Sequence, residues 1–186
     1  PDSPLMLFYR GSLPDPERPS AAMVGTRRPT GEGIQTALNL SKQFAENGVP
    51  VISGLAYGID TFSHRGCLEG GGKTVAVLAC GVESIYPRTN KRLAAAILES
   101  DGCIISEYPP GTEPLQFRFP ERNRIVSGLS RSVIIVEAPE KSGALITADF
   151  ALEQGRDVFV CKAVLNSPQN AGGRRLNEEG ACAVSG

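Results

Sequence analysis

The chain has 186 residues, of which 41% are hydrophobic and 21% charged, and its formal net charge is −1 at neutral pH. This apolar fraction is ordinary for a globular protein. It excludes a disordered chain, which could not bury enough apolar surface to offset the entropy of ordering. The near-neutral charge excludes a globally basic nucleic-acid binder, so any such role requires a local patch.

Two features bear on the compartment. The first residues contain no basic and apolar leader, and no apolar run approaches the ~18 residues of a membrane helix, so we expect neither a signal peptide nor a membrane span. The five cysteines are odd in number and form no CxxC pair. We expect reduced, buried thiols at Cys80, Cys103 and Cys161 in a cytoplasmic protein. A single histidine, His64, and scattered cysteines predict no structural zinc site. We also expect no other metal and no cofactor.

The order of apolar runs predicts the domain organisation. Residues 1–20 are proline-rich and weakly periodic, which indicates an arm or connector, and residues 21–186 are expected to form one domain. Short apolar runs then alternate with helical periodicity. The expected strands are 21–24, 49–53, 74–80, 103–106, 132–138 and 157–161, with a further strand at 182–185. The expected helices are 34–47, 59–69, 90–99, 122–129 and 144–154.

The strands read as continuous apolar runs, which is typical of strands covered on both faces. Their alternation with helices predicts a doubly wound, mostly parallel α/β sheet with helices on both faces. Such sheets bind ligands at the carboxyl ends of their strands, near the topological switch point. The loops that follow each strand are therefore the candidate sites.

The loop after the first strand, residues 25–33, places glycines, a hydroxyl, Arg27 and Arg28 before a helix. Backbone N–H groups and the positive end of a helix there would cradle an anion; the alternative is a glycine-rich turn with solvated arginines. A dinucleotide site is disfavoured, because Thr36 stands at the third glycine of GxGxxG and no acidic residue ends the second strand. Gly72-Lys73-Thr74 is no P-loop, because it precedes a strand.

The loop after the second strand contains Ser53 and Gly54, which allow close backbone approach. Asp60 and His64 are four residues apart and would face one another on a helix. A nucleophile at Ser53 or Ser63 is conceivable. The favoured interpretation is structural, with Asp60 in the first helical turn holding His64.

Residues 118–131 contain four arginines and one glutamate, with Phe117 and Phe119 interleaved. Basic groups that follow phosphates and aromatic faces that stack bases are typical of single-stranded DNA binding. The sequence leaves an alternative open, in which the phenylalanines are core and the arginines pair with Glu107, Glu113 or Glu121. After the fifth strand, Ser142 and Gly143 begin a helix whose N-terminus could hold a phosphate, although capping alone is favoured.

Several strings together resemble the DNA-processing protein A (DprA/Smf) family, over about residues 5 to 160. These strings are 24–29, 53–60 with His64, 76–81 with Tyr86-Pro87, 106–111, 119–129 and 142–148. The resemblance implies an extended Rossmann-like domain that binds single-stranded DNA and helps to load the RecA recombinase during natural transformation. It also implies a homodimer, no enzymatic activity and no membrane contact.

By position, the resemblance implies that Gly25, Thr26 and Arg27 hold a backbone phosphate and that Arg122, Asn123 and Arg124 line the same pocket. Arg118 and Phe119 would contact a phosphate or a base. The complete expected DNA site is Gly25, Thr26, Arg27, Arg28, Ser53, Gly54, Arg118, Phe119, Arg122, Asn123, Arg124, Ser142 and Gly143.

The sequence departs from the family pattern over 161–181, where Lys162, Arg174 and Arg175 add basic groups, so the C-terminal wall of the pocket is in question. Flanking domains of the family do not fit within this length, which leaves the central domain only. One alternative is a nucleotide-binding or nucleotide-hydrolysing enzyme related to phosphoribohydrolases, but their Pro-Gly-Gly-x-Gly-Thr-x-x-Glu string is missing at 139–144. Another is a scaffold that acts by protein contact alone.

Overall fold

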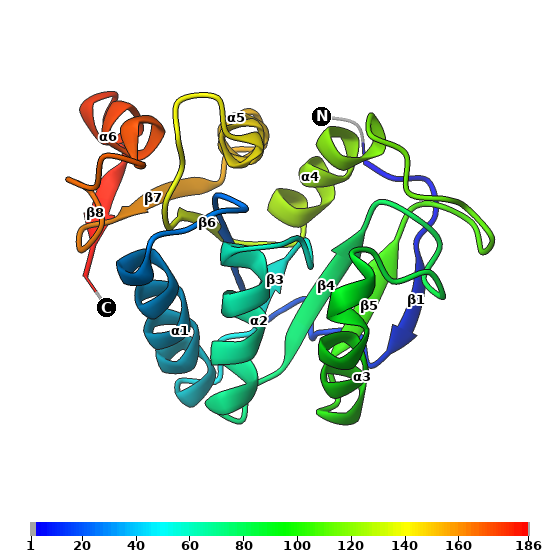
Figure 1. Cartoon of the computed structure of the whole chain (residues 1–186). Coiled ribbons are helices and arrows are strands. Elements are labelled where there is room, and N and C mark those ends of the chain that lie inside the picture. Colours follow the sequence, from blue (N-terminus) through cyan, green and yellow to red (C-terminus); the bar gives the residue numbers. More distant parts are fainter. Residues whose placement is uncertain (1–2, 186) are drawn as a thin grey trace.

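A computed structural model of the chain describes residues 3–185 and contains one eight-stranded sheet (Figure 1). Its strand order is β1-β5-β4-β3-β2-β6-β7-β8, with β1 antiparallel to β5 and every other pair parallel. This confirms the mostly parallel α/β architecture. The strands are β1 (Phe8–Gly11), β2 (Ala21–Val24), β3 (Val51–Ser53), β4 (Thr74–Leu78), β5 (Cys103–Ser106), β6 (Ser132–Ile135), β7 (Asp157–Cys161) and β8 (Cys182–Val184).

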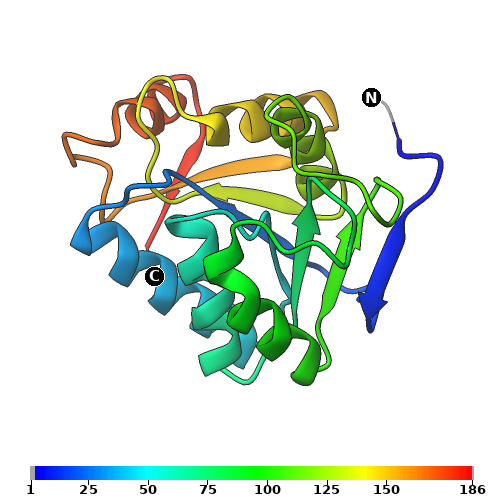
Figure 2. The same ribbon diagram turned by 45° about the vertical axis from the view of Figure 1, so that its right-hand side comes forward.

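Helices cover both faces of the sheet, as Figures 1 and 2 show, with α1 to α3 on one side and α4 to α6 on the other. Side chains alternate along β2: Ala21 and Met23 pack in the cluster beneath α1 and α2, whereas Ala22 and Val24 pack beneath α4 and α5. The helices are α1 (Gly31–Glu46), α2 (Ile59–Glu69), α3 (Lys91–Glu99), α4 (Arg118–Gly128), α5 (Gly143–Glu153) and α6 (Ala171–Glu178), with a short 3₁₀ helix at Arg88–Asn90.

The topological switch point lies between β2 and β6. From β2 the chain adds β3, β4 and β5 on one side, and then crosses to add β6, β7 and β8 on the other. The loops that follow β2 and β6 therefore leave toward opposite faces of the sheet, and a crevice opens between them at the carboxyl ends of the strands.

Two elements lie where the sequence predicted none. Part of the expected N-terminal arm forms β1, which pairs with β5 at the edge of the sheet. Residues 171–178 form α6. Its Gly172 lies so close to α5 that a Cβ there would be 2.8 Å from the Leu145 side chain. Glycine lowers the helix propensity of this segment, so its helical structure follows from tertiary packing.

Helix α4 begins at Arg118, four residues before the expected start. Pro120 occupies the first turn, where a missing N–H costs no intrahelical hydrogen bond. The segment 118–121 therefore belongs to the helix rather than to the preceding loop.

The five cysteines are unpaired, and Cys67, Cys80, Cys103 and Cys161 are buried, which confirms the interpretation of the apolar-run cysteines as buried thiols. Among the described helices, none combines the length and the apolarity that a membrane span requires.

Candidate nucleic-acid interface

A cavity of about 710 Å³ opens at the switch point, between the loops that follow β2 and β6 and the start of α4. The structure brings together there most of the residues expected from the sequence. The expected residues that line it are Gly25, Thr26, Arg27, Phe119, Arg122, Asn123, Ser142 and Gly143.

Five expected residues do not line the cavity: Arg28, Ser53, Gly54, Arg118 and Arg124. Arg124 instead forms an ion pair with Glu107, with 2.6 Å between Nη2 and Oε1. It is two positions from Arg122 on α4, so the two side chains leave the helix in different directions. Of the Arg–Glu pairings considered from sequence, the structure thus forms the one between Arg124 and Glu107.

Arg122 is the buried cation of the cavity, with only 4% of its surface exposed. Its Nη1 donates to the carbonyl oxygen of Gly54 at 2.7 Å and to that of Val77. A Cβ at Gly54 would collide with the guanidinium, so this approach requires glycine. Burial lowers the pKa of Arg122 and the Asp60 carboxylate opposes that shift, while the guanidinium remains charged.

Asp60 lies in the first turn of α2 and holds the loop that leads into it. Its Oδ2 accepts the N–H groups of Gly54 at 3.0 Å and Ala56 at 3.4 Å. Burial raises the pKa of Asp60, and the charge of Arg122 opposes the shift. Asp60 therefore sets the position of the backbone that Arg122 contacts.

His64 is fully buried and does not interact with Asp60 through any hydrogen bond among the described residues. Its Nδ1 lies 2.7 Å from Thr74 Oγ1, which itself donates to the carbonyl of Val51. Ser63 Oγ donates to the Ile59 carbonyl. The expectation that Asp60 holds His64 is therefore wrong, although both residues do have structural partners.

The N-terminus of α1, expected to cradle an anion, is filled by the protein's own carboxylate. Glu137 is fully buried and accepts the Thr30 N–H at 2.8 Å, the Thr30 hydroxyl at 3.0 Å and the Ser167 hydroxyl at 2.8 Å. A Cβ at Gly33 would collide with this carboxylate. The anion cradle at α1 is therefore unavailable to a ligand, and this part of the sequence interpretation is wrong.

The N-terminus of α5 faces the cavity instead. Ser142 caps this helix by accepting the Ala144 N–H at 3.3 Å, as predicted, and Ser142, Gly143 and Ala144 all line the cavity. The positive end of a helix favours an anion at such a position. Lys141 lines the cavity beside it. The charged residues that line the cavity are therefore three basic ones, Arg27, Arg122 and Lys141, and one acidic one, Asp60.

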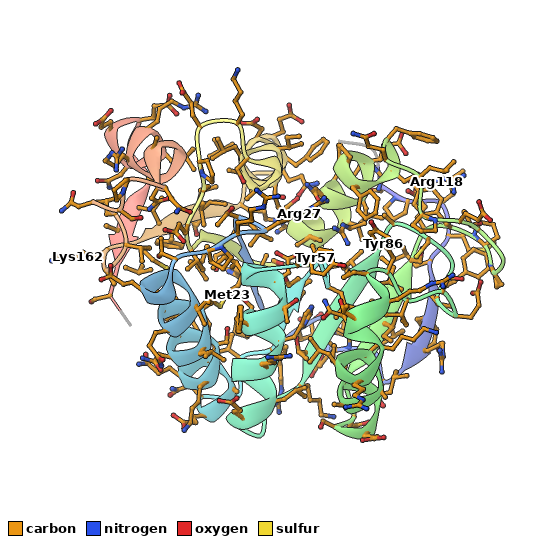
Figure 3. The ribbon with its side chains drawn as sticks, viewed as in Figure 1. Met23, Arg27, Tyr57, Tyr86, Arg118 and Lys162 are labelled. Atoms are coloured by element: carbon orange, nitrogen blue, oxygen red, sulfur yellow. The ribbon has the colours of Figure 1, made fainter. Side chains whose placement is uncertain are left out.

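Two aromatic rings complete the rim. The centroids of Phe119 and Tyr86 are 5.5 Å apart, and Arg27 Cζ lies 5.5 Å from the centroid of Phe119. Figure 3 labels Arg27 and Tyr86 above the α2–α3 layer, on the side of α4. Lys141 and Tyr86 are lining residues that sequence reasoning missed as site residues. The available signal for Lys141 was its position beside the predicted cap Ser142. For Tyr86 the signal was the Tyr86-Pro87 string.

The divergent segment 161–181 does not line the cavity. It holds the loop after β6 through hydrogen bonds. Asn170 Oδ1 accepts the Ala138 N–H at 2.8 Å, and the Ser167 hydroxyl donates to Glu137. Its basic residues Lys162, Arg174 and Arg175 therefore add nothing to the charge of the cavity wall.

Comparison of the sequence with protein families and curated proteins indicates which family the chain belongs to. The family model described as DNA recombination-mediator protein A matches residues 1–186. DNA processing protein DprA of Streptococcus pneumoniae is 44% identical over 99% of this chain and 64% of its own length, and that of Bacillus subtilis is 43% identical over 98% and 62%. Protein Smf of Escherichia coli is 41% identical over 99% of this chain and 49% of its own length. The chain thus spans about half to two thirds of these curated relatives.

Solved structures agree. DNA processing protein A of Streptococcus pneumoniae superposes with a TM-score of 0.89 at 43% identity, covering 97% of this chain and 63% of that one. The Helicobacter pylori protein, described for its unique single-stranded DNA binding mode, gives 0.89 at 32% identity, covering 99% and 83%. A molybdenum cofactor binding protein of Rippkaea orientalis, at 17% identity and a TM-score of 0.62 over 91% and 89%, shares the fold. The chain therefore belongs to the DNA recombination-mediator protein A family, which includes the DprA and Smf proteins.

Proposed function

We propose that this domain binds single-stranded DNA in the switch-point cavity. The observation that carries the proposal is the meeting of three basic side chains, the N-terminus of α5 and two aromatic rings in one open cavity. Basic groups neutralise phosphates, whereas aromatic faces stack bases without regard to sequence. The Helicobacter pylori relative, described for its single-stranded DNA binding mode, supports the same role.

A backbone phosphate is proposed to lie between the two walls of the cavity. Arg27 is exposed and, within residues 3–185, forms no ion pair, so its charge is available. Thr26 and Gly25 bring the backbone of the same loop to the cavity, and Arg122 and Asn123 face it from α4. Arg122 acts from a buried position, where reduced screening strengthens its attraction for a phosphate.

Single strands are preferred over duplex in this account because only unpaired bases can leave the stack and pack on Phe119 and Tyr86. In duplex DNA both faces of each base are already stacked, so the aromatic contribution is lost. The domain is proposed to act by binding, without catalysis. The structural hydrogen bonds of Asp60, Ser53 and Ser63 support this, because they engage the carboxyl group and both hydroxyls considered for a nucleophilic site.

The remaining role follows from family membership and is also a proposal. We infer that the complete protein delivers bound single-stranded DNA to the RecA recombinase in the cytoplasm, during recombination and natural transformation. A homodimer would place two cavities on one particle. Because binding at the second cavity is then intramolecular, the apparent affinity for a long strand rises.

The direct test is a titration of labelled oligothymidylate, followed by fluorescence anisotropy at several salt concentrations. We expect binding that is tighter than to a matched duplex and that weakens with salt. Arg27→Ala should weaken binding at least about tenfold and reduce the slope of log affinity against log salt by about 0.7, since one phosphate contact is lost.

The matched control is Arg175→Ala, because Arg175 is an exposed arginine on α6 outside the cavity. It makes the same charge change and should leave the affinity and the salt slope unchanged. Absence of binding at low salt, equal affinity for duplex, or equal effects of the two substitutions would each contradict the proposal.

A further inference from the structure

A second group of aromatic and basic side chains lies outside the cavity, at the start of α4. Phe117, the residue before this helix, is 57% exposed. Neither Phe117 nor its neighbour Arg118 lines the cavity, although Gln116 and Phe119 on either side of them do. An exposed ring beside a cation, next to a proposed nucleic-acid site, is typical of a base-stacking position.

Arg118 is held by its neighbours in a defined place. Its Cζ lies 5.0 Å from the centroid of the Tyr108 ring and 5.5 Å from that of Phe117, and its Nη1 donates to the carbonyl oxygen of Glu113. Tyr108 is fixed in turn, because its hydroxyl donates to Glu121 Oε2 at 2.8 Å. Such preorganisation reduces the entropy lost when a ligand binds.

The charge of Arg118 is also available. Within residues 3–185 no carboxylate forms an ion pair with it, and the carbonyl of Glu113 leaves its formal charge uncompensated. A guanidinium over aromatic rings keeps N–H groups at its edge, where they can donate to a phosphate. The group therefore pairs an exposed stacking face with a phosphate donor.

This group continues the rim of the cavity. Phe119, which lies against Arg27 and Tyr86 inside the cavity, is adjacent in sequence to Arg118. In Figure 3, Arg118 lies beyond Tyr86 as seen from Arg27, on the same upper side of the α2–α3 layer. A strand that leaves the cavity past Phe119 would meet this group next.

We propose that Phe117, Arg118 and Tyr108 form an outer subsite for single-stranded DNA, in which a base stacks on Phe117 and the adjoining phosphate lies at Arg118. This inference rests on the proposed function, because a strand held in the cavity supplies the ligand. The outer subsite adds affinity only for strands long enough to extend beyond the cavity.

Length dependence tests the outer subsite. Phe117→Ala should leave the affinity for the shortest oligothymidylate that binds unchanged. It should weaken binding of long oligothymidylates about fivefold or more, as expected for loss of one base–aromatic stack. Arg27→Ala should weaken binding at every length. A thermal melt of each variant checks that it folds. Because Phe117 is exposed, we expect Phe117→Ala to remain folded.

A tryptophan reporter gives an independent readout, because the chain contains no tryptophan. Phe117→Trp should be quenched by long oligothymidylates and unaffected by the shortest one that binds. The matched control is Leu152→Trp, at a 59% exposed position on α5 that does not line the cavity. Its emission should stay constant at every length.

The outcomes separate the two proposals. If Arg27→Ala weakens binding while Phe117→Ala does not, and the reporter stays unquenched, the outer subsite is contradicted and the cavity stands. If Phe117→Ala weakens all lengths equally, Phe117 acts with the cavity and a separate subsite is contradicted. If the wild-type domain binds no oligothymidylate, the proposed function itself fails.

Discussion

Arg27 and Arg122 reach the same cavity in opposite ways. Arg27 is exposed on a loop and lies against one aromatic ring, whereas Arg122 is buried on a helix with its Nη1 engaged by two carbonyl oxygens. Loss of Arg27 would remove the proposed phosphate contact and little else. Loss of Arg122 would also leave the Gly54 and Val77 carbonyls without their donor and Asp60 without its neighbouring charge, so its cost combines stability and binding.

The buried imidazole of His64 gives a pH prediction. Burial lowers its pKa from 6.5 to about 3. Below pH 6.5, His64 is therefore protonated in the unfolded chain but stays neutral in the folded chain. The free energy of unfolding therefore has its full value above pH 6.5 and decreases as the pH falls below 6.5. The slope approaches about 1.4 kcal/mol per pH unit. Urea denaturation between about pH 7.5 and 5 measures it.

The control for this prediction is His64→Asn, measured over the same pH range. Burial raises the pKa of Asp60, so protonation of Asp60 at low pH acts in the opposite direction. The readout is therefore the difference in slope between wild type and variant, whatever the overall loss of stability. Identical slopes would show that His64 is not kept neutral by the fold.

Residue spacing predicted part of the site. The run 117–124 drew attention to Phe119, Arg122 and Asn123, which line the cavity. Spacing alone could not separate Arg122 from Arg124, because that depends on which face of α4 packs on the sheet. The anion cradle at α1 was misplaced for a related reason. Glu137 is more than one hundred positions away in sequence, and only the adjacency of β2 and β6 brings it to Thr30.

At the scale of elements, apolar runs and cap residues located most strands and helices. Helix α2 was predicted with its observed bounds, and Ser142 as the cap of α5 was confirmed. Strand β1 and helix α6 were missed. The first is a short edge strand in a proline-rich segment, and the second contains adjacent glycines. Each is supported by a neighbouring element, because β1 pairs with β5 and Gly172 of α6 packs against Leu145 of α5.

The contact between two loops gives a prediction at this scale. Gly58 precedes α2 with φ +74°, and a Cβ there would collide with the carbonyl oxygen of Thr26. Gly58→Ala should therefore displace the loop that carries Arg27. We expect the free energy of unfolding to fall by about 2–3 kcal/mol and single-stranded DNA binding to weaken. Urea denaturation and anisotropy measure the two effects.

Gly71 supplies the matched control. It has φ +71°, but a Cβ there would meet no atom within 4 Å. Gly71→Ala should cost about 1 kcal/mol from the left-handed backbone alone and leave DNA binding unchanged. Equal binding defects in the two variants would contradict the proposed coupling between Gly58 and the Arg27 loop.

For the whole molecule, the location of the cavity follows from topology. The chain reverses its direction of strand addition between β2 and β6, so the loops that separate there form opposite walls at the carboxyl ends of the strands. Three basic side chains and one carboxyl group line this cavity, in a chain whose net charge is −1. The proposed outer subsite would extend the same rim and give an unpaired strand a second place of contact.

A crystal structure of the domain with bound oligothymidylate tests the central claim most directly. The account predicts a phosphate held between Arg27 and the N-terminus of α5, with a base packed on Phe119. A strand bound on another face of the molecule, with the cavity between β2 and β6 left without nucleotide, would contradict it.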